Sequence, residues 1–450
     1  MIFKRKIYDK FLEWKKVSQG QTALMVEGAR RIGKSTVVEE FAKNEYEDYL
    51  LLDFARENKD VKQIFENDIG DMNVFFRNLF LLKGKSIPER KSVIILDEVQ
   101  LFPLARQAIK YLVQDGRFDY IETGSLISIK KNVQDILIPS EEYRIKMYPM
   151  DFEEFLWANN DTFTAEVIRD AFEKRKALGD TVHRKIMQTF RTYMVVGGMP
   201  QSVKAFVDGK NYQEIDFVKR NILSLYEADL KKYDDDNREK ASVIFKTIPE
   251  QLENHNSHFK FSLVDKNARY KNYVDAVGFV AESMIGNECI HVTAPEVSLE
   301  AYADRSNFKL YMGDTGLLIT QMMRSRDETE ESLYKLIVLD KLGINQGMIV
   351  ENIVAQMLRV RGYDLYFHEF KYCSGEAVKE SKYEIDFLLV KKKKICPIEV
   401  KSSNYKKHTS FDMFKQKYPI KVEDQYIIYT KDLRYEDGIL YLPLYMTMCL

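Results

Sequence analysis

Residues 28–35 read GARRIGKS, and the two flanks of this stretch decide the fold around it. The apolar run TALMV at residues 22–26 precedes it, and TVVEEFAK at residues 36–43 follows it with the spacing of a helix. A glycine-rich turn between a strand and a helix lets backbone N–H groups and the helix N-terminus face a phosphate group. The stretch therefore predicts a phosphate-binding loop, and a chance glycine-rich turn is the alternative.

Two side chains of this loop predict its chemistry. Lys34 would reach the β- and γ-phosphates of a bound nucleotide and assist transfer of the γ-phosphoryl group, and the Ser35 hydroxyl would be a ligand of Mg²⁺. The residues expected to contact ATP and its metal ion here are Gly28, Arg31, Gly33, Lys34, Ser35 and Thr36.

The apolar strand SVIILDEVQ ends in two carboxylates, Asp97 and Glu98. Asp97 would hold Mg²⁺, mostly through water, and Glu98 would polarise the attacking water. An isolated Asp-Glu pair is often an ordinary solvated turn, but the phosphate loop upstream favours the catalytic interpretation. The following strand, YIETGS, places Thr123 and Ser125 where a hydroxyl would sense the γ-phosphate or cap a helix.

Arg144, in the stretch EEYRIKMYPMDFEEF, is a candidate for stabilising charge on the γ-phosphate. It would act in its own subunit or in a neighbouring subunit of a homo-oligomer. A solvated arginine without such a role is the alternative.

Composition limits the class of protein. The 450 residues exceed a single hydrophobic core, so we expect two to four domains. The 68 basic and 69 acidic residues nearly cancel, so any contact with a polyanion must be local. The four cysteines form no Cys-x-x-Cys pair, and no stretch approaches the length of a membrane span. These features indicate a cytoplasmic protein with no membrane partner.

The pattern along the chain divides it into four parts. Short apolar strands alternate with helices over residues 1–150, which predicts an α/β fold with a parallel sheet wrapped by helices. Residues 151–238 are almost wholly helical, with a break at GGMP. Residues 239–330 combine helices with a short strand and resemble a winged helix. Residues 340–450 combine one helix with several strands, which predicts a small α/β domain.

In chain order, the motifs GARRIGKS, IILDEVQ, ETGSL, YPMDFEEF and VVGGMPQSV resemble those of a prokaryotic family of AAA-type P-loop ATPases. The resemblance continues through FKLYMGDTGLL, IVENIVAQML, EIDFLL and IEVKSS, so it spans nearly the whole chain. It implies that the helical block is a lid, followed by a winged helix and a restriction-endonuclease-like domain of uncharacterised function. It also implies that Gly198 and Pro200 lie near adenine, unless they only end a helix. The family commonly has glycine before the arginine at position 144, whereas this chain has Tyr143.

A second set of charged residues lies in the last predicted domain. Asp386 starts the apolar part of one strand, and Glu399 and Lys401 share one face of the next. Two converging carboxylates can share Mg²⁺ or Mn²⁺, and a lysine beside them can orient the attacking water. This arrangement looks like the metal site of restriction-endonuclease-like nucleases, to which Glu351 on the preceding helix would add a ligand. Strand-edge charges paired with Lys401 are the alternative.

Two regions are candidates for contact with DNA. Residues 340–450 carry more Lys and Arg than Asp and Glu, and Lys391–Lys394 form a basic run that could also be a solvated turn. Within residues 260–280, the stretch NARYKNYVDAV would supply a recognition helix, with Arg269 and Lys271 facing phosphate. Winged helices also contact proteins, so this alternative stays open.

Taken together, these features predict an Mg²⁺-dependent ATPase coupled to a nuclease-like domain that acts on DNA or in defence. Two alternatives stay open. One is a slow nucleotide switch that recruits a protein partner, with an inactive nuclease-like scaffold. The other is a DNA-binding regulator controlled by ATP.

Overall fold

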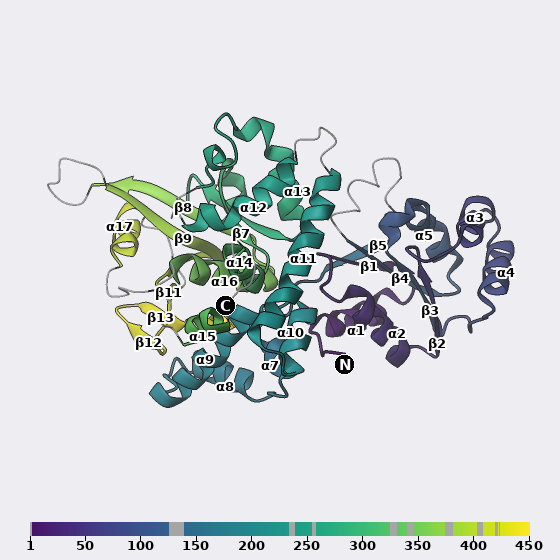
Figure 1. The fold of residues 1–450 in the computed structure, drawn as a ribbon, viewed down its shortest axis with the longest axis horizontal. Helices are drawn as coiled ribbons and strands as arrows, with labels where there is room; N and C mark the ends of the chain where they lie inside the picture. Colours follow the sequence, from purple (N-terminus) through teal and green to yellow (C-terminus); the bar gives the residue numbers. More distant parts are fainter. Residues whose placement is uncertain are drawn as a thin grey trace. The chain divides into compact units, whose positions relative to one another are not determined.

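A computed structural model describes most of the chain, and it separates into two compact units (Figure 1). The first unit contains residues 1–148, 228–235 and 282–284, and the second contains the rest. The described residues are 2–125, 139–233, 239–253, 258–324, 331–339, 346–373, 381–402, 408–418, 422 and 424–450.

The first unit is an α/β domain, as predicted. Its described residues form a five-stranded parallel sheet in the order β2-β3-β4-β1-β5. The strands are β1 Ala23–Gly28, β2 Asp48–Asp53, β3 Ser92–Asp97, β4 Asp119–Ser125 and β5 Glu142–Lys146. Because the strands are parallel, the ends of β1, β3 and β4 lie at one edge of the sheet, where the predicted phosphate site requires them.

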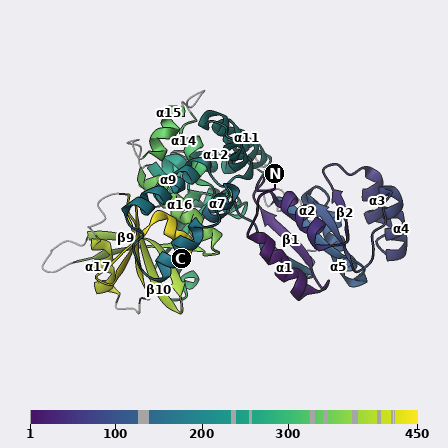
Figure 2. The same ribbon diagram turned by 90° about the horizontal axis from the view of Figure 1, so that it is seen from below.

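Helices cover both faces of this sheet. Side chains such as Met25 and Leu96 pack with three helices in one apolar core, while Leu24 and Val26 alternate to the opposite face. On that opposite face, α1 and α2 lie beside β1 (Figure 2). Phe11 of α1 packs edge-on against Phe41 of α2. The helical elements are α1 Ile7–Ser18, α2 Lys34–Glu45, α3 Lys59–Asn67, α4 Met72–Lys83, the 3₁₀ turn η1 Val99–Leu101 and α5 Pro103–Asp115.

The second unit contains a mixed sheet. Its described residues form eight strands in the order β12-β13-β11-β10-β9-β8-β6-β7. The strands are β6 Gly286–Val292, β7 Ala303–Met312, β8 Leu365–Tyr372, β9 Ser381–Lys391, β10 Lys394–Val400, β11 Gln425–Tyr429, β12 Arg434–Glu436 and β13 Ile439–Pro443.

Helices of the predicted lid belong to this second unit, except for the end of α11. Those of the lid region are α7 Phe152–Ala158, α8 Thr164–Glu173, α9 Asp180–Val196, α10 Pro200–Val207 and α11 Tyr212–Tyr233. The later ones are α12 Lys240–Glu253, α13 Val274–Glu282, α14 Thr315–Met322, α15 Glu331–Val338, α16 Gln346–Val360 and α17 Thr409–Lys417, with 3₁₀ turns η2 Phe261–Leu263, η3 Tyr270–Asn272, η4 Leu299–Tyr302 and η5 Leu444–Cys449.

The region predicted to be a winged helix does not have a sheet of its own. Its strand β6 pairs in parallel with β8, so β6 and β7 extend the same sheet that the C-terminal strands form. The predicted recognition helix is also replaced by irregular structure. Arg269 precedes η3 and Lys271 lies within it, and the regular helix α13 starts only at Val274. The side chain of Asp265 accepts a hydrogen bond from the backbone of Asn267, a turn that competes with helix formation.

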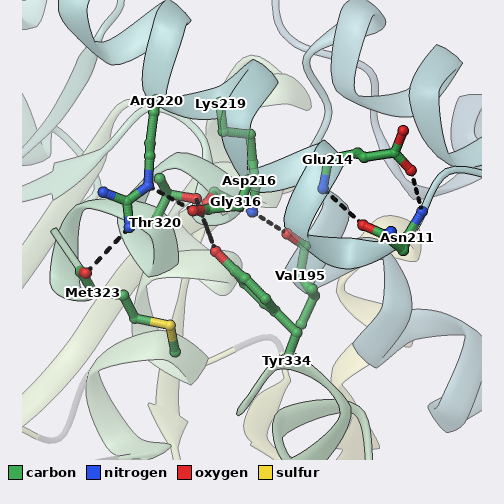
Figure 3. A network of polar contacts seen from close by, with 10 residues as sticks. All are labelled: Val195, Asn211, Glu214, Asp216, Lys219, Arg220, Gly316, Thr320, Met323 and Tyr334. Carbon is green, nitrogen blue, oxygen red and sulfur yellow. Dashed lines mark hydrogen bonds and ion pairs between the residues drawn. The ribbon is translucent and has the colours of Figure 1, made fainter. Parts of the chain in front are cut away.

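A buried polar network joins α9, α11, α14 and α15 in the second unit (Figure 3). The ammonium group of Lys219 donates to the carbonyls of Val195, at 2.8 Å, and Gly316, at 3.3 Å. Burial lowers the pKa of Lys219 to about 8. One helical turn before it, Asp216 accepts hydrogen bonds from the side chains of Arg220, Thr320 and Tyr334. The charged groups of Asp216 and Lys219 thus hold the helices of this network together.

Candidate functional site

The GARRIGKS loop has the backbone shape that its sequence predicts. Gly33 precedes α2 with φ +91°, and Arg31 also has a left-handed φ of +68°. Gly28 ends β1 where a Cβ would stand 2.5 Å from the carbonyl oxygen of Met147, so no larger residue fits without a shift. These conformations curl the chain between β1 and the N-terminus of α2. Arg31 and Thr36 are exposed, and their contacts with a nucleotide stay predictions.

Lys34 lies under this loop rather than in solvent. Its side chain is 6% exposed, and its ammonium group donates to the carbonyls of Gly28, at 3.0 Å, and Ala29, at 2.9 Å. Burial lowers the pKa of Lys34 to about 8, against the opposing effect of the charges of Glu98 and Asp97. Burial deprives this ammonium group of water and so disfavours its positive charge. An anionic ligand that binds beside it would stabilise that charge.

Asp97 at the end of β3 brings two hydroxyls together. Ser35 donates to its Oδ1 at 2.8 Å, and Thr123 of β4 donates to the same oxygen. A hydroxyl and a carboxylate are oxygen groups of the kind that Mg²⁺ prefers, so Ser35 would hold this ion directly and Asp97 mostly through water. The structure therefore brings together three residues that the sequence assigned to one site.

Glu98 and Ser125 also lie at this edge. Glu98 has a left-handed φ of +57°, and its backbone N–H donates to the hydroxyl of Thr123 at 3.4 Å. Ser125 pairs in register with Gly28 on the adjacent strand. Its buried hydroxyl has no hydrogen-bond partner in the part of the chain that the structure describes. Both residues lie beside the phosphate loop, as predicted from the sequence.

Arg144 lies away from this edge within its own subunit. It pairs in register with Met25, three residues before Gly28, or about 10 Å along the strand. Its Nε lies 3.0 Å from Oε2 of Glu142, a buried carboxylate that Arg106 also binds at 2.7 and 2.8 Å. The geometry does not support a role for Arg144 at its own phosphate loop. A role in a neighbouring subunit stays a prediction.

Two contacts at the loop were not predicted from the sequence. Arg30 forms an ion pair with Asp229 of α11, at 2.8 Å. Gln100, in η1, donates a hydrogen bond from its side-chain amide to Oε2 of Glu98. The sequence DEVQ could have indicated the contact between Gln100 and Glu98, because it places a side-chain amide two residues after the predicted base.

Gly198 and Pro200 belong to the second unit, where they have a structural role. The N–H of Gly198 donates to Oδ2 of Asp314 at 2.6 Å, and its carbonyl accepts from the N–H of Met150 at 2.7 Å. Pro200 starts α10, a position that suits its missing N–H. Both backbone groups of Gly198 are thus engaged by protein, and the predicted contact with adenine stays a prediction.

The charged residues of the predicted C-terminal site lie in one another's electrostatic field. Burial, followed by the charge of Glu351, raises the pKa of Asp386 well above its ordinary value, and Lys309 opposes this effect. Oδ2 of Asp386 accepts from the backbone N–H of Val400 at 2.7 Å. The four predicted residues therefore lie near one another, and the sequence had not indicated Lys309, Tyr311 or Glu384 as their neighbours.

Protein groups already bind three carboxylates of this C-terminal cluster. Glu399 pairs with Lys401, and Glu384 pairs with Lys309. Tyr311 donates to Oε2 of Glu351 at 3.2 Å. Among the described residues, no group of three or more His, Cys, Asp or Glu side chains is arranged to hold a metal ion. The arrangement agrees with the ion-pair alternative for Lys401, and the metal site stays a prediction.

The basic run Lys391–Lys394 forms the hairpin between β9 and β10. Lys391 pairs with Lys394, and both intervening lysines have left-handed backbones, with φ of +48° and +60°. The two central lysines of the run therefore form a two-residue turn. This agrees with the alternative that the run is a solvated turn and not a contact with DNA. Residues 340–345, 374–380, 403–407, 419–421 and 423 of the predicted DNA-binding region lie outside the described residues.

Known protein families match three segments of the chain. Residues 20–156 match an AAA domain, residues 187–328 match a domain of unknown function (DUF8612), and residues 346–446 match another (DUF4143). No curated protein matches the chain. None of the helices in the described parts of the chain is long and apolar enough to cross a membrane.

Several solved structures match this chain at low sequence identity. A Walker-type ATPase of Pyrococcus abyssi is 12% identical with a TM-score of 0.41, and the match covers 71% of this chain and 96% of that one. The RuvB Holliday junction branch migration motor of Thermotoga maritima is 13% identical with a TM-score of 0.28, covering 63% and 89%. A signal transduction ATPase with a tetratricopeptide repeat sensor from Pyrococcus horikoshii is 12% identical with a TM-score of 0.27, covering 80% and 49%. By these matches, the chain contains an AAA-type P-loop ATPase domain, followed by two domains of unknown function.

Proposed function

We propose that the protein binds ATP with Mg²⁺ and hydrolyses it at the edge formed by β1, β3 and β4. The observation that supports this most strongly is the convergence of Ser35 and Thr123 on one oxygen of Asp97, beside the buried ammonium group of Lys34. A metal-ligating carboxylate, a hydroxyl ligand and a phosphate-binding cation are the parts that phosphoryl transfer needs.

Each residue then has a defined task. The backbone of the loop and Lys34 bind the phosphates, and Lys34 leaves the carbonyls of Gly28 and Ala29 to do so. Ser35 and Asp97 hold Mg²⁺, which when bound neutralises charge on the β- and γ-phosphates. Glu98 accepts a proton from the attacking water, and Thr123 fixes Asp97 beside it.

Two substitutions separate binding from chemistry. Lys34→Ala should abolish tight ATP binding, because it removes the cation that contacts the β- and γ-phosphates. Glu98→Gln should keep binding and slow hydrolysis, because Asp97 and Ser35 still hold the metal ion while the base is lost. Gln114→Ala, an exposed change at the end of α5, is a matched control that should leave both unchanged. Hydrolysis by Lys34→Ala at the wild-type rate would refute the proposal.

The C-terminal cluster supports a second candidate function, metal-dependent cleavage of nucleic acid. Four acidic side chains and two lysines act on one another there: Glu351, Glu384, Asp386 and Glu399 with Lys309 and Lys401. Burial raises the pKa values of Glu384, Asp386 and Glu399, and a divalent ion beside them would favour their charged forms. Asp386, Glu399 and Glu351 would hold it, and Lys401 would orient the water.

The test of this second function uses nucleotide-free full-length protein and both Mg²⁺ and Mn²⁺. We expect these ions to raise the melting temperature of the wild type, by mass action, and Asp386→Ala to remove that rise together with any cleavage of DNA or RNA. Lys401→Ala should keep the rise and lose cleavage, and the exposed change Glu296→Ala is the control. If wild-type protein shows neither cleavage nor a metal-dependent rise, the domain is a scaffold.

Measurements of ATP turnover and of ADP retention in the same protein preparations, with and without DNA, distinguish three possible roles of the ATPase. Turnover that DNA stimulates supports coupling to a DNA transaction or a DNA-binding regulator. Tight retention of ADP without any effect of DNA supports a switch that recruits a protein. Turnover per subunit that rises with protein concentration, and falls in Arg144→Ala, supports a homo-oligomer in which Arg144 acts on a neighbour.

A further inference from the structure

The predicted base Glu98 is not held by its backbone alone. The amide nitrogen of Gln100 donates to Oε2 of Glu98. Gln100 is 3% exposed, whereas Glu98 is partly exposed, so a buried amide is directed at a carboxylate that faces the site. Glu98 also acts electrostatically on Lys34, which places its charge near the phosphate-binding cation.

The turn that carries Gln100 is fixed to the core of the first unit. Val99 and Phe102 flank it and are buried in the apolar cluster with α3, α4 and α5. The ring of Phe102 lies 5.3 Å from that of Phe54 and 5.9 Å from that of Phe65. The backbone N–H of Leu101 donates to the carbonyl of Glu98 at 2.9 Å and closes the turn. The amide of Gln100 therefore reaches Glu98 from a rigid support.

A neutral amide suits this position better than a charged group would. An amide N–H donor holds a carboxylate oxygen without neutralising its charge, whereas a lysine or arginine would weaken the carboxylate as a base. A carboxylate has two oxygens, so one can stay bound to the amide while the other accepts a proton. The left-handed backbone of Glu98 is an unfavourable conformation, so a contact that fixes its side chain from a rigid turn is useful.

We propose that Gln100 is a positioning residue for ATP hydrolysis: it binds Oε2 of Glu98 and leaves Oε1 to take the proton from the attacking water. The inference rests on the proposed function, since it assigns a support to the base of that reaction. It predicts that Gln100 affects the chemical step and not the binding of nucleotide.

The experiment compares Gln100→Ala and the similarly sized Gln100→Leu with wild type, and uses Gln114→Ala as the control. We expect kcat for ATP to fall about 10- to 100-fold in both Gln100 variants, with the dissociation constant for Mg²⁺-ATP within about twofold of wild type. A misfolded variant would instead lose nucleotide binding.

A double-mutant cycle distinguishes positioning from a general structural effect. In a Glu98→Gln background, Gln100→Ala should cause no further loss of kcat, because the group it supports is already absent. An equal loss in both backgrounds, an unchanged kcat in Gln100→Ala, or a rise in kcat would each overturn the inference. Wild-type protein without Glu98-dependent hydrolysis would overturn the proposed function as well, so the two failures can be told apart.

Discussion

The buried ammonium group of Lys34 makes ATP affinity depend on pH in a way that can be calculated. Its pKa is about 8 in the free protein, because burial disfavours the charged form. In the complex the triphosphate restores a higher pKa, so above pH 8 binding requires the uptake of one proton. Linkage then gives an apparent dissociation constant that rises about tenfold between pH 7 and pH 9 and about tenfold more by pH 10.

Whereas ATP affinity should fall as the pH rises, the stability of the nucleotide-free protein should increase. A lysine ordinarily titrates near pH 10.5, so between pH 8 and 10.5 the unfolded chain binds more protons at this position than the folded chain. Stability from this group therefore rises with pH across that window, by about 3 kcal/mol in total. Below pH 8 Lys34 is charged in the folded protein, and burying that charge lowers the free energy of unfolding by the same ~3 kcal/mol. Lys34→Met should therefore stabilise the nucleotide-free protein below pH 8 while abolishing ATP binding.

Calorimetric titration with Mg²⁺-ATP from pH 7.5 to 9.5 measures the first effect, and urea unfolding of wild type and Lys34→Met measures the second. Repeating the titration in buffers of different ionisation enthalpy counts the protons taken up. Lys34→Arg is the control, because arginine stays charged over this range and its residual affinity should not vary with pH. An ATP affinity that is constant from pH 7.5 to 9.5 in wild type would refute the reasoning.

Three further predictions concern the packing of each unit, and urea unfolding measures all of them. Gly198→Ala should cost about 3 kcal/mol, because its Cβ would stand 2.2 Å from the carbonyl oxygen of Met150, whereas Gly209→Ala, in open space, should cost only about 1 kcal/mol. A similar loss in both would contradict this. Arg106→Leu should cost about 3 kcal/mol, because it removes a bidentate partner from a buried carboxylate, and a loss below 1 kcal/mol would argue against the pair. Tyr334→Phe should cost about 1 to 2 kcal/mol through its lost hydrogen bond, and no change would contradict the network of Figure 3.

The phosphate site was predictable because parallel strands bring distant residues to one edge by a simple rule. Lys34 follows an apolar strand, Asp97 ends one and Thr123 lies near the end of another, and the carboxyl ends of neighbouring parallel strands meet. Gln100 could not be assigned in the same way, because its contact with Glu98 depends on the geometry of a short 3₁₀ turn.

The second unit was less predictable because its contacts join segments that are far apart in the sequence. β6 lies beside β8 in the sheet, although β7, α14, α15 and α16 come between them along the chain, so the predicted wing is part of a larger sheet. Lys309 likewise meets Glu384, 75 residues later. An apolar pattern indicates that a strand is buried, but it does not specify which strand lies next to it.

The two glycine-rich motifs GGMP and GARRIGKS are similar in sequence, but they differ in the charged group that lies beside the turn. In GGMP, the negative charge is built into the protein: Asp314 accepts from the N–H groups of Gly198 and Leu317, and the charge of Lys219 acts on it. In GARRIGKS, the cation is built in, and the ammonium group of Lys34 donates to loop carbonyls that an anionic ligand can replace. A turn whose anion is already present stabilises the fold, whereas a turn that supplies only the cation is suited to bind phosphate.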